Sequence, residues 1–185
     1  MGEPKTTRAQ RGVEETRQME AIMAAHESAL LGYATGILRS PQAAQDVVQN
    51  VFIKLFRMWK PGMQPTDSLR GWLYRCTHNE AVDHIRHESR LHILHLRRTT
   101  EADPPAAPAG SPGNDEAEKQ ATVLAHVQKL DPAEQQVILL RLQEGMSYKE
   151  ISRVTGRSEG NVGCLLHHAV KKLSRLVQKA GEAEP

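Results

Sequence analysis

Residues Ser147–Leu173 read SYKEISRVTGRSEGNVGCLLHHAVKKL, and this stretch predicts two helices joined by a tight turn. Ser147 and Glu150 have the spacing of a capping box, which begins a helix at Ser147. Gly156 suits the turn, because glycine tolerates the positive φ that a chain reversal requires. Ser158 can then cap a second helix. The layout is that of a helix-turn-helix, with an ordinary helical hairpin in a small bundle as the alternative interpretation.

The second helix of this pair has one apolar face and one polar face. Apolar residues recur at helical spacing: Val162, Leu165, Leu166, Ala169, Leu173 and Leu176. The opposite face carries Asn161, His167, His168, Lys171, Lys172 and Arg175. From Ser147 to Ala180 basic residues outnumber acidic ones by seven to two, although the whole chain has a net charge of only +2. A local excess of this kind suits nucleic acid, and a solvated helix face is the alternative.

The 185-residue chain is long enough for one domain or two small ones, and its composition limits its class. No apolar run approaches the length of a membrane span, and the start has no signal-peptide pattern, so we expect no membrane insertion. Cys76 and Cys164 lie far apart in separate helical patterns. A disulfide framework is therefore not expected, and a reducing cytoplasmic location fits better.

A change of composition divides the chain into two blocks. Residues 97–114, RRTTEADPPAAPAGSPGN, contain proline, alanine, glycine and serine but no large apolar residue. Such a segment cannot bury enough surface to fold, which predicts a flexible linker. The blocks on either side, 18–96 and 115–178, show apolar residues at helical spacing and no alternation, so the predicted fold class is all-α.

The N-terminal block predicts three helices. The first helix has an apolar stripe along one face, made of Ile22, His26, Leu30, Tyr33, Ile37 and Leu38. Ser40-Pro41 begins the second, whose expected core face is Ala44, Val47, Val48, Val51, Phe52, Leu55, Phe56 and Trp59. Its other face places a lone Ile53 among Asp46, Gln49, Asn50 and Arg57. A single exposed apolar residue needs no explanation, and a docked partner is the sharper interpretation.

The third helix is expected from Thr66–Ser68 to about Ser89, with apolar residues on two sides. Between those sides project Arg75, Asn79, Arg86 and Arg90. Aromatic rings beside arginines suit single-stranded nucleic acid, because bases stack on rings while guanidinium groups hold the backbone. For Trp72 this interpretation and a plain core role stay open, whereas Trp59 is interpreted as a core residue.

The C-terminal block opens with a helix expected over residues 116–130. Asp131-Pro132 then begins another, with Val137, Ile138, Leu140 and Leu142 as apolar residues and an end near Gly145. The helix-turn-helix closes the block.

Three segments resemble a known family. Asp46–Phe52 reads DVVQNVF, and Arg70–Arg75 reads RGWLYR and precedes Asn79, Asp83 and Arg86. Leu130–Ser152 reads LDPAEQQVILLRLQEGMSYKEIS. Together they resemble regions two and four of the extracytoplasmic-function group of bacterial RNA polymerase sigma factors. The resemblance implies two small helical domains joined by a flexible linker, a region two bundle at 18–96 and a region four helix-turn-helix domain at 115–178.

The same resemblance implies an alternative sigma factor that directs transcription initiation. Its implied partners are core RNA polymerase (the clamp helices of the largest catalytic subunit and the flap of the second-largest), promoter DNA and an anti-sigma factor. The residues implied for polymerase binding are Asp46, Gln49, Asn50, Ile53 and Arg57. Those implied for the promoter −10 element are Leu69, Trp72, Arg75, Asn79 and Arg86. Those implied for the −35 element are Arg157, Ser158, Asn161, His167, His168 and Lys171.

The chain departs from this family at two places. Gly163, Cys164 and Leu165 stand where relatives often carry arginines on the recognition helix, so phosphate contact should be weaker and its salt dependence smaller. Asn50 stands where relatives usually carry an acidic residue.

Other functional classes fit the sequence less well. A glycine-rich phosphate loop, a zinc-protease motif and a nucleophile elbow are all lacking, so we expect no enzyme, no catalytic residues and no cofactor. The pairs His84/His87 and His92/His95 have spacing that can grip a metal, but a solvated or phosphate-facing role is favoured and no metal is expected. The main alternative is a helix-turn-helix regulator that acts on duplex DNA without being a polymerase subunit. A third alternative is a pure protein-interaction module, but this interpretation gives no function to the basic, aromatic third helix.

Overall fold

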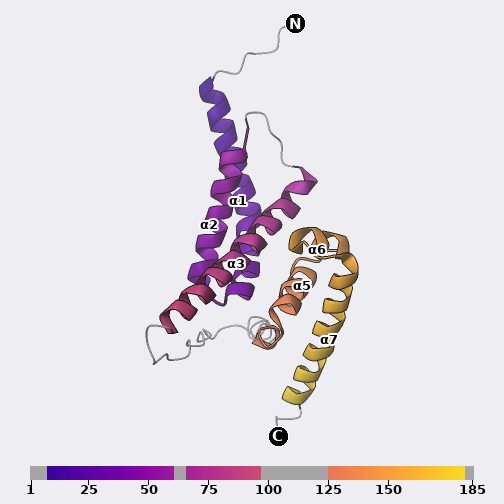
Figure 1. Ribbon diagram of the computed structural model, residues 1–185. Coiled ribbons are helices and arrows are strands. Elements are labelled where there is room, and N and C mark those ends of the chain that lie inside the picture. Colours follow the sequence, from indigo (N-terminus) through magenta and orange to yellow (C-terminus); the bar gives the residue numbers. More distant parts are fainter. Residues whose placement is uncertain (1–7, 61–65, 97–124, 182–185) are drawn as a thin grey trace.

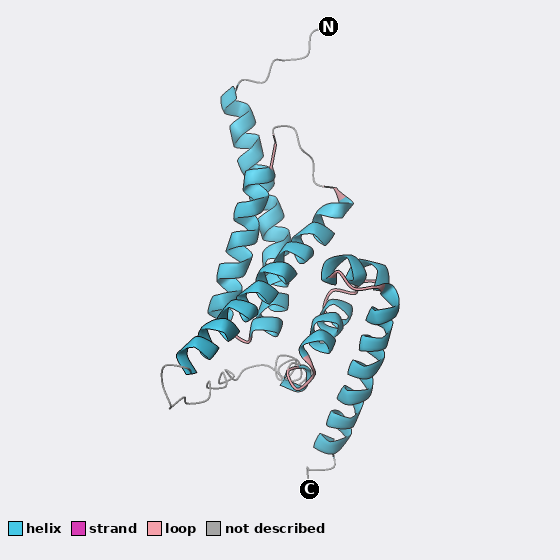
Figure 2. Cartoon of the chain, in the orientation of Figure 1, coloured by secondary structure: helices cyan, strands magenta, loops and turns pink. Residues whose placement is uncertain are grey.

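The computed structural model describes residues 8–60, 66–96 and 125–181, and every regular element in these ranges is a helix (Figures 1 and 2). A first helical group contains α1 (Arg8–Leu38), α2 (Pro41–Met58) and α3 (Asp67–Leu96). A second contains α5 (Pro132–Leu142), α6 (Tyr148–Thr155) and α7 (Glu159–Gly181). The all-α prediction is confirmed. The predicted linker 97–114 lies outside the described residues, as does most of the helix predicted over 116–130.

Helix α2 is the central element of the first group. Ser40 caps it, with its Oγ accepting from the Ala43 N–H at 3.2 Å, and Pro41 stands at the first helical position. As predicted, the buried stripe is Ala44, Val47, Val48, Val51, Phe52 and Leu55, packed between α1 and α3. Trp59 is partly buried against this core. The prediction was wrong for Phe56, which is 67% exposed, because it follows Gln49 and Ile53 by seven and three residues and so shares their outer face.

Two helices of the first group are longer than predicted. α1 already begins at Arg8 and ends at Leu38, and the next residue, Arg39, has a left-handed φ of 57°. The Arg39 N–H still donates to the Thr35 carbonyl at 2.8 Å, and the positive φ of Arg39 then turns the chain out of the helix. α3 begins where expected, at Asp67, but continues past Ser89 to Leu96.

The local signals of the second group are confirmed. The Ser147 N–H donates to Glu150 Oε2 at 2.7 Å and the Glu150 N–H donates to Ser147 Oγ at 3.3 Å, completing the capping box of α6. Gly156 has a φ of 70°, and Ser158 Oγ accepts from the Asn161 N–H at 3.2 Å at the start of α7. The apolar residue predicted at Leu142 is exposed instead, because α5 ends there.

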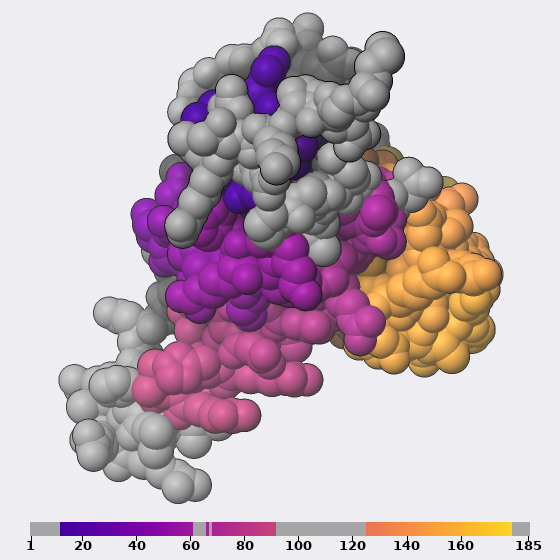
Figure 3. Space-filling view, turned by 90° about the horizontal axis from the view of Figure 1, so that it is seen from above, coloured from indigo at the N-terminus to yellow at the C-terminus, as the bar shows by residue number. Residues whose placement is uncertain are grey.

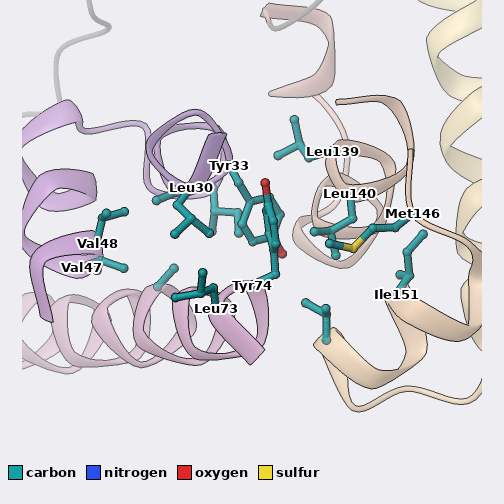
Figure 4. Packing of buried hydrophobic residues seen from close by; sticks show 14 of the residues in the cluster. Leu30, Tyr33, Val47, Val48, Leu73, Tyr74, Leu139, Leu140, Met146 and Ile151 are labelled. Carbon is teal, nitrogen blue, oxygen red and sulfur yellow. The ribbon is translucent and has the colours of Figure 1, made fainter. Parts of the chain in front are cut away.

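The two groups pack directly against each other (Figures 1 and 3). α3 lies against α6, and α1 lies against α5. One continuous core runs through both, and Figure 4 shows the rings of Tyr33 and Tyr74 between Leu30 and Leu73 on one side and Leu140 and Met146 on the other. The sequence predicted two helical domains but not this contact.

Candidate functional site

The outer face of α2 is the first candidate surface. All five residues predicted for it are exposed: Asp46, Gln49, Asn50, Ile53 and Arg57. Ile53 is 40% exposed, and Phe56 and Met58 extend the apolar exposure along the helix. Because Ile53 has apolar neighbours, it belongs to a patch and is not an isolated surface residue.

This patch borders a groove of about 620 Å³ between α1 and α2. Gln49, Ile53 and Arg57 line it with Phe52 and Phe56 from α2. α1 contributes the opposite wall: Met19, Met23, Glu27 and Leu31. Sequence reasoning missed that wall and Phe56, although the spacing of Gln49, Ile53 and Phe56 could have revealed the latter. The groove has an apolar floor and a polar rim, a combination that suits an amphipathic helix.

The second candidate surface is the N-terminal half of α3. Leu69 and Trp72 are partly buried, whereas Arg75 and Asn79 are exposed. Leu69, Trp72 and Arg75 line a cleft of about 770 Å³ that Glu150 and Arg153 of α6 close from the other side. Arg86 lies further along α3, is exposed, and pairs with Asp83 at 3.1 Å. The structure therefore brings three of the five predicted residues together and leaves Asn79 and Arg86 on the open length of the helix.

Sequence reasoning gave no role to Arg70, which joins α3 to the second group. Its Nη2 donates to the Glu144 carbonyl at 2.6 Å, and its guanidinium lies 5.5 Å from the Tyr74 ring centroid. A carboxylate oxygen of Glu144 lies 3.4 Å from the same nitrogen. The carbonyl and the ring hold this arginine in place, so it is an organising residue of the cleft.

Behind the cleft a buried histidine is hydrogen-bonded to a buried tyrosine. Tyr33 Oη lies 3.0 Å from His78 Nδ1. Burial raises the pKa of Tyr33, so the phenol keeps its proton, and the tautomer of the neutral imidazole decides which of the two groups donates. Burial, followed by the positive charges of Arg157 and Arg86, lowers the pKa of His78 to about 4. The positive charge of Arg157, in the turn after α6, thus lowers the pKa of a histidine on α3.

The third candidate surface is the start and outer face of α7. Ser158, Asn161, His167, His168 and Lys171 are exposed, as a recognition helix requires. Arg157 is not on this open face. It is partly buried, its carbonyl accepts from Ser152 Oγ at 2.6 Å, and its Nε is buried with no hydrogen-bond partner among the described residues.

Lys172 was expected on the polar face of α7, where it could contact DNA. Its ammonium group instead forms ion pairs within the protein. Its Nζ lies 2.5 Å from Asp131 Oδ2 and 2.8 Å from Glu134 Oε2, at the start of α5. Glu134 is only 4% exposed, so this lysine balances a buried carboxylate. Apart from the histidines, Lys171 is therefore the one exposed fixed positive charge among the residues predicted to contact the −35 element; Arg157 is partly buried, and Arg175 lies exposed further along α7.

The described residues show few signs of a metal site, a disulfide or a membrane-spanning helix. No group of three or more potential metal ligands occurs among them, and His84 instead lies 3.4 Å from Glu88 on the same helix. Cys76 and Cys164 are free thiols. Within the described ranges, no helix is both long and apolar enough to cross a bilayer.

Comparisons with known proteins give a consistent result. The model of Sigma-70 region 2 matches residues 22–91, and the model of Sigma-70 region 4 matches residues 121–173. The RNA polymerase sigma factor CarQ of Myxococcus xanthus is 27% identical, covering 89% of this chain and 90% of the relative. The RNA polymerase sigma-H factor of Pseudomonas aeruginosa is 26% identical, covering 92% and 91%. The ECF sigma factor SigE of Mycolicibacterium smegmatis is 27% identical, and the match covers 52% of its length.

Solved structures of sigma factors share the fold. CnrH, in complex with the cytosolic domain of CnrY, aligns with a TM-score of 0.61 and 25% identity over 92% of this chain and 94% of that one. The sigma factor RpoE of Bartonella quintana, in complex with the anti-sigma factor NepR, aligns with a TM-score of 0.63 and 18% identity, covering 86% and 96%. The two family regions occur in order, one on each helical group. The chain belongs to the sigma-70 family of RNA polymerase sigma factors, in its extracytoplasmic-function group.

Proposed function

We propose that this sigma factor binds core RNA polymerase through the outer face of α2 and holds promoter DNA with α3 and α7. Members of its family are DNA-binding regulatory subunits. The observation that carries the proposal is the groove beside α2, since its exposed apolar residues lie on the helix that bears the predicted docking residues. A sigma factor acts on polymerase and DNA, so we expect it in the cytoplasm.

Polymerase docking is assigned to the groove and its rim. Gln49, Ile53 and Arg57 line the groove, and Asp46 and Asn50 lie on the same exposed face. A helix pair such as the polymerase clamp can place apolar side chains against Ile53 and Phe56 while the polar rim fixes its register. Asn50 supplies hydrogen bonds there but no negative charge, so Asp46 is the only carboxylate among the five residues assigned to docking.

The −10 element is assigned to α3. The exposed amide of Asn79 can form two hydrogen bonds with a base edge, and Trp72 with Leu69 can pack on an unstacked base. Arg75 and Arg86 would hold phosphates. The exposed pair between Arg86 and Asp83 is worth about 0–1 kcal/mol, so it does not prevent a phosphate from taking that arginine.

The −35 element is assigned to α7 and the turn before it. Ser158 and Asn161 stand at the start of the helix, where side chains of a recognition helix reach base edges, and His167, His168 and Lys171 follow along it. With Arg157 and Lys171 as the two fixed charges, the salt dependence of binding should have a slope of only about −2 on a log–log scale. Such weak contact with the −35 element becomes effective only when the second helical group is held near the DNA, through the linker to the first group and through polymerase.

Two further partners are proposed. Val170 and Val177 are exposed on one side of α7, and they are candidates for the flap of the second-largest polymerase subunit. An anti-sigma factor is also proposed, because RpoE, a related fold, is known in complex with one. It would have to cover the α2 groove or the cleft beside α3 to block function.

The test is a binding assay with core polymerase. Asp46→Ala combined with Gln49→Ala removes one charge and one amide from exposed positions, so the fold should be unaffected. The double variant should bind core polymerase more weakly while its thermal unfolding stays the same. Unchanged affinity in a quantitative pull-down would show that core polymerase does not dock on Asp46 and Gln49 of α2. Promoter-specific starts by purified core polymerase that carries no other sigma factor, obtained only when this chain is added, distinguish a sigma factor from a regulator that acts on duplex DNA alone.

A further inference from the structure

The cleft between the start of α3 and α6 has three arginines on its walls (Figure 1). Arg70 and Arg75 come from α3, and Arg153 comes from α6. Glu150 is the one carboxylate among the lining residues, and it is already engaged, because its Oε2 accepts from the Ser147 N–H at 2.7 Å. Three fixed positive charges against one negative charge favour an anionic occupant.

Two of these arginines are available to such an occupant. Arg75 and Arg153 are exposed and take part in none of the ion pairs formed within the described ranges. Arg70 is held in place instead, by the Glu144 carbonyl and the Tyr74 ring, and so adds charge at a fixed position. A guanidinium group presents a planar fork that matches phosphate oxygens, so two of them on different helices suit a chain of phosphates.

A histidine on the third wall responds to the same positive charge. His26 of α1 is partly buried and lines the cleft. Burial, followed by the positive charge of Arg70, lowers the pKa of His26, so its imidazole is neutral at pH 7. A phosphate in the cleft would oppose the charge of Arg70 and raise this pKa. His26 therefore serves as a reporter of an anion bound in the cleft.

The cleft also has an apolar side. Trp72 is partly buried there, and Leu69 and Met146 line the cleft with it. A nucleic acid base stacks on an indole ring, whereas an inorganic anion or an acidic peptide would leave this side without a partner. The volume of about 770 Å³ lies within the range of about 300–1,000 Å³ that small-molecule sites occupy. The cleft therefore suits a ligand that carries both a base and several phosphates.

From these features we propose that the cleft binds a free nucleoside triphosphate, with its base against Trp72 and its phosphates between Arg75 and Arg153. The site stands on the cleft alone, but one consequence rests on the proposed function, which assigns Trp72 and Arg75 to the −10 strand. A free nucleotide and that strand would then compete for the same residues. The affinity of the chain for single-stranded promoter DNA would fall as the concentration of free nucleotide rises.

Binding is tested by calorimetric titration of the full chain with ATP, GTP, CTP and UTP in about 0.1 M NaCl. Adenosine and inorganic triphosphate are titrated as the two halves of ATP. A Trp59→Phe variant leaves Trp72 as the only tryptophan, so quenching of its fluorescence reports a base that stacks on it. The pKa of His26 is followed by NMR, with His26→Gln to identify its signal.

We expect a dissociation constant for at least one of the four nucleotides below about 1 mM, and for ATP, if it binds, at least about tenfold below that of either half. The fluorescence of Trp72 should be quenched and the pKa of His26 should rise. Absence of heat and of quenching with every nucleotide up to about 1 mM would overturn the proposal. Triphosphate that binds as tightly as the nucleotides would do so too, as would an unchanged His26 pKa in the nucleotide complex.

A pair of variants of α6 separates the site from general attraction by charge. Arg153→Ala should weaken nucleotide binding at least about tenfold, because it removes a charge-assisted contact with phosphate. Lys149→Ala is the matched control, since it removes one exposed positive charge from the same helix but does not line the cleft. Its affinity should stay within about twofold of the parent. Equal losses in the two variants would contradict a defined site.

Competition distinguishes this proposal from the proposed function. A labelled single-stranded oligonucleotide of mixed sequence is bound to the free chain, and the nucleotide that binds most tightly is added to saturation. Release of the oligonucleotide supports a shared site. If the nucleotide binds as described while the oligonucleotide either stays bound or does not bind at all, the assignment of the −10 strand to Trp72 is wrong and the nucleotide site stands.

Discussion

Phe56 provides a quantitative test of the docking groove, because it is the most exposed of the aromatic side chains beside it. It is 67% exposed, so of about 200 Å² that a phenylalanine can bury, about 130 Å² is free for a partner. At about 25 cal/mol per Å², complete coverage contributes about 3 kcal/mol to binding. The remaining third contributes about 1–2 kcal/mol to folding by the same conversion.

Phe56→Ala should therefore weaken core polymerase binding by about 10- to 100-fold, since coverage in an interface is partial and about 1.4 kcal/mol is tenfold. The free energy of unfolding should fall by only about 1 kcal/mol. Affinity is measured by titrating labelled sigma factor with core polymerase, and stability by denaturant unfolding. Val13→Ala is the matched control, because Val13 is 71% exposed on α1 and does not line the groove. Affinity within about twofold of the parent would refute the groove as the docking site.

The remaining predictions concern the promoter face, a buried histidine and the turn of the helix-turn-helix. Asn79→Ala should reduce promoter-dependent transcription more than core polymerase binding, and equal losses in both assays would contradict base reading by α3. His78 has a folded pKa of about 4, below its unfolded value of 6.5, so the stability from its neutral form is present above pH 6.5 and lost as the pH falls toward 4. Denaturant unfolding at pH 7 and pH 4.5 should show a loss of about 2–3 kcal/mol that His78→Gln lacks; identical pH dependence in both proteins would exclude this role. Gly156→Ala should destabilise the chain by about 1 kcal/mol, because φ is 70°, whereas Gly160→Ala, in a helix with equal free space, should be neutral or stabilising.

The local structure was predictable because its causes lie within a few residues of one another. The capping box of Ser147 and Glu150 involves neighbours three positions apart, and the left-handed conformation of Gly156 follows from glycine alone. The stripe of α2 was predictable for the same reason. Phe56 was misplaced because its spacing from Phe52 fits the core stripe as well as its spacing from Ile53 fits the outer face, and only the position of α1 and α3 separates the two.

The contact between the two groups was not predictable from local pattern. Gln135 and Gly36 are 99 positions apart, and neither residue type indicates a partner. The bond between Tyr33 and His78 is of the same kind, since a histidine on a basic helix reads as a solvated residue. The predicted site residues were found largely through the resemblance to a family, whereas Arg70 and the α1 wall of the groove emerged only from packing.

The most direct test of the central claim is transcription in vitro with purified core polymerase on genomic promoter fragments. We predict discrete transcripts that require both the sigma factor and core polymerase, and that are lost when Asp46 and Gln49 are both alanine. A chain that protects duplex DNA from cleavage by itself, yet produces no promoter-specific start with core polymerase, would contradict the account and favour a regulator that acts without polymerase.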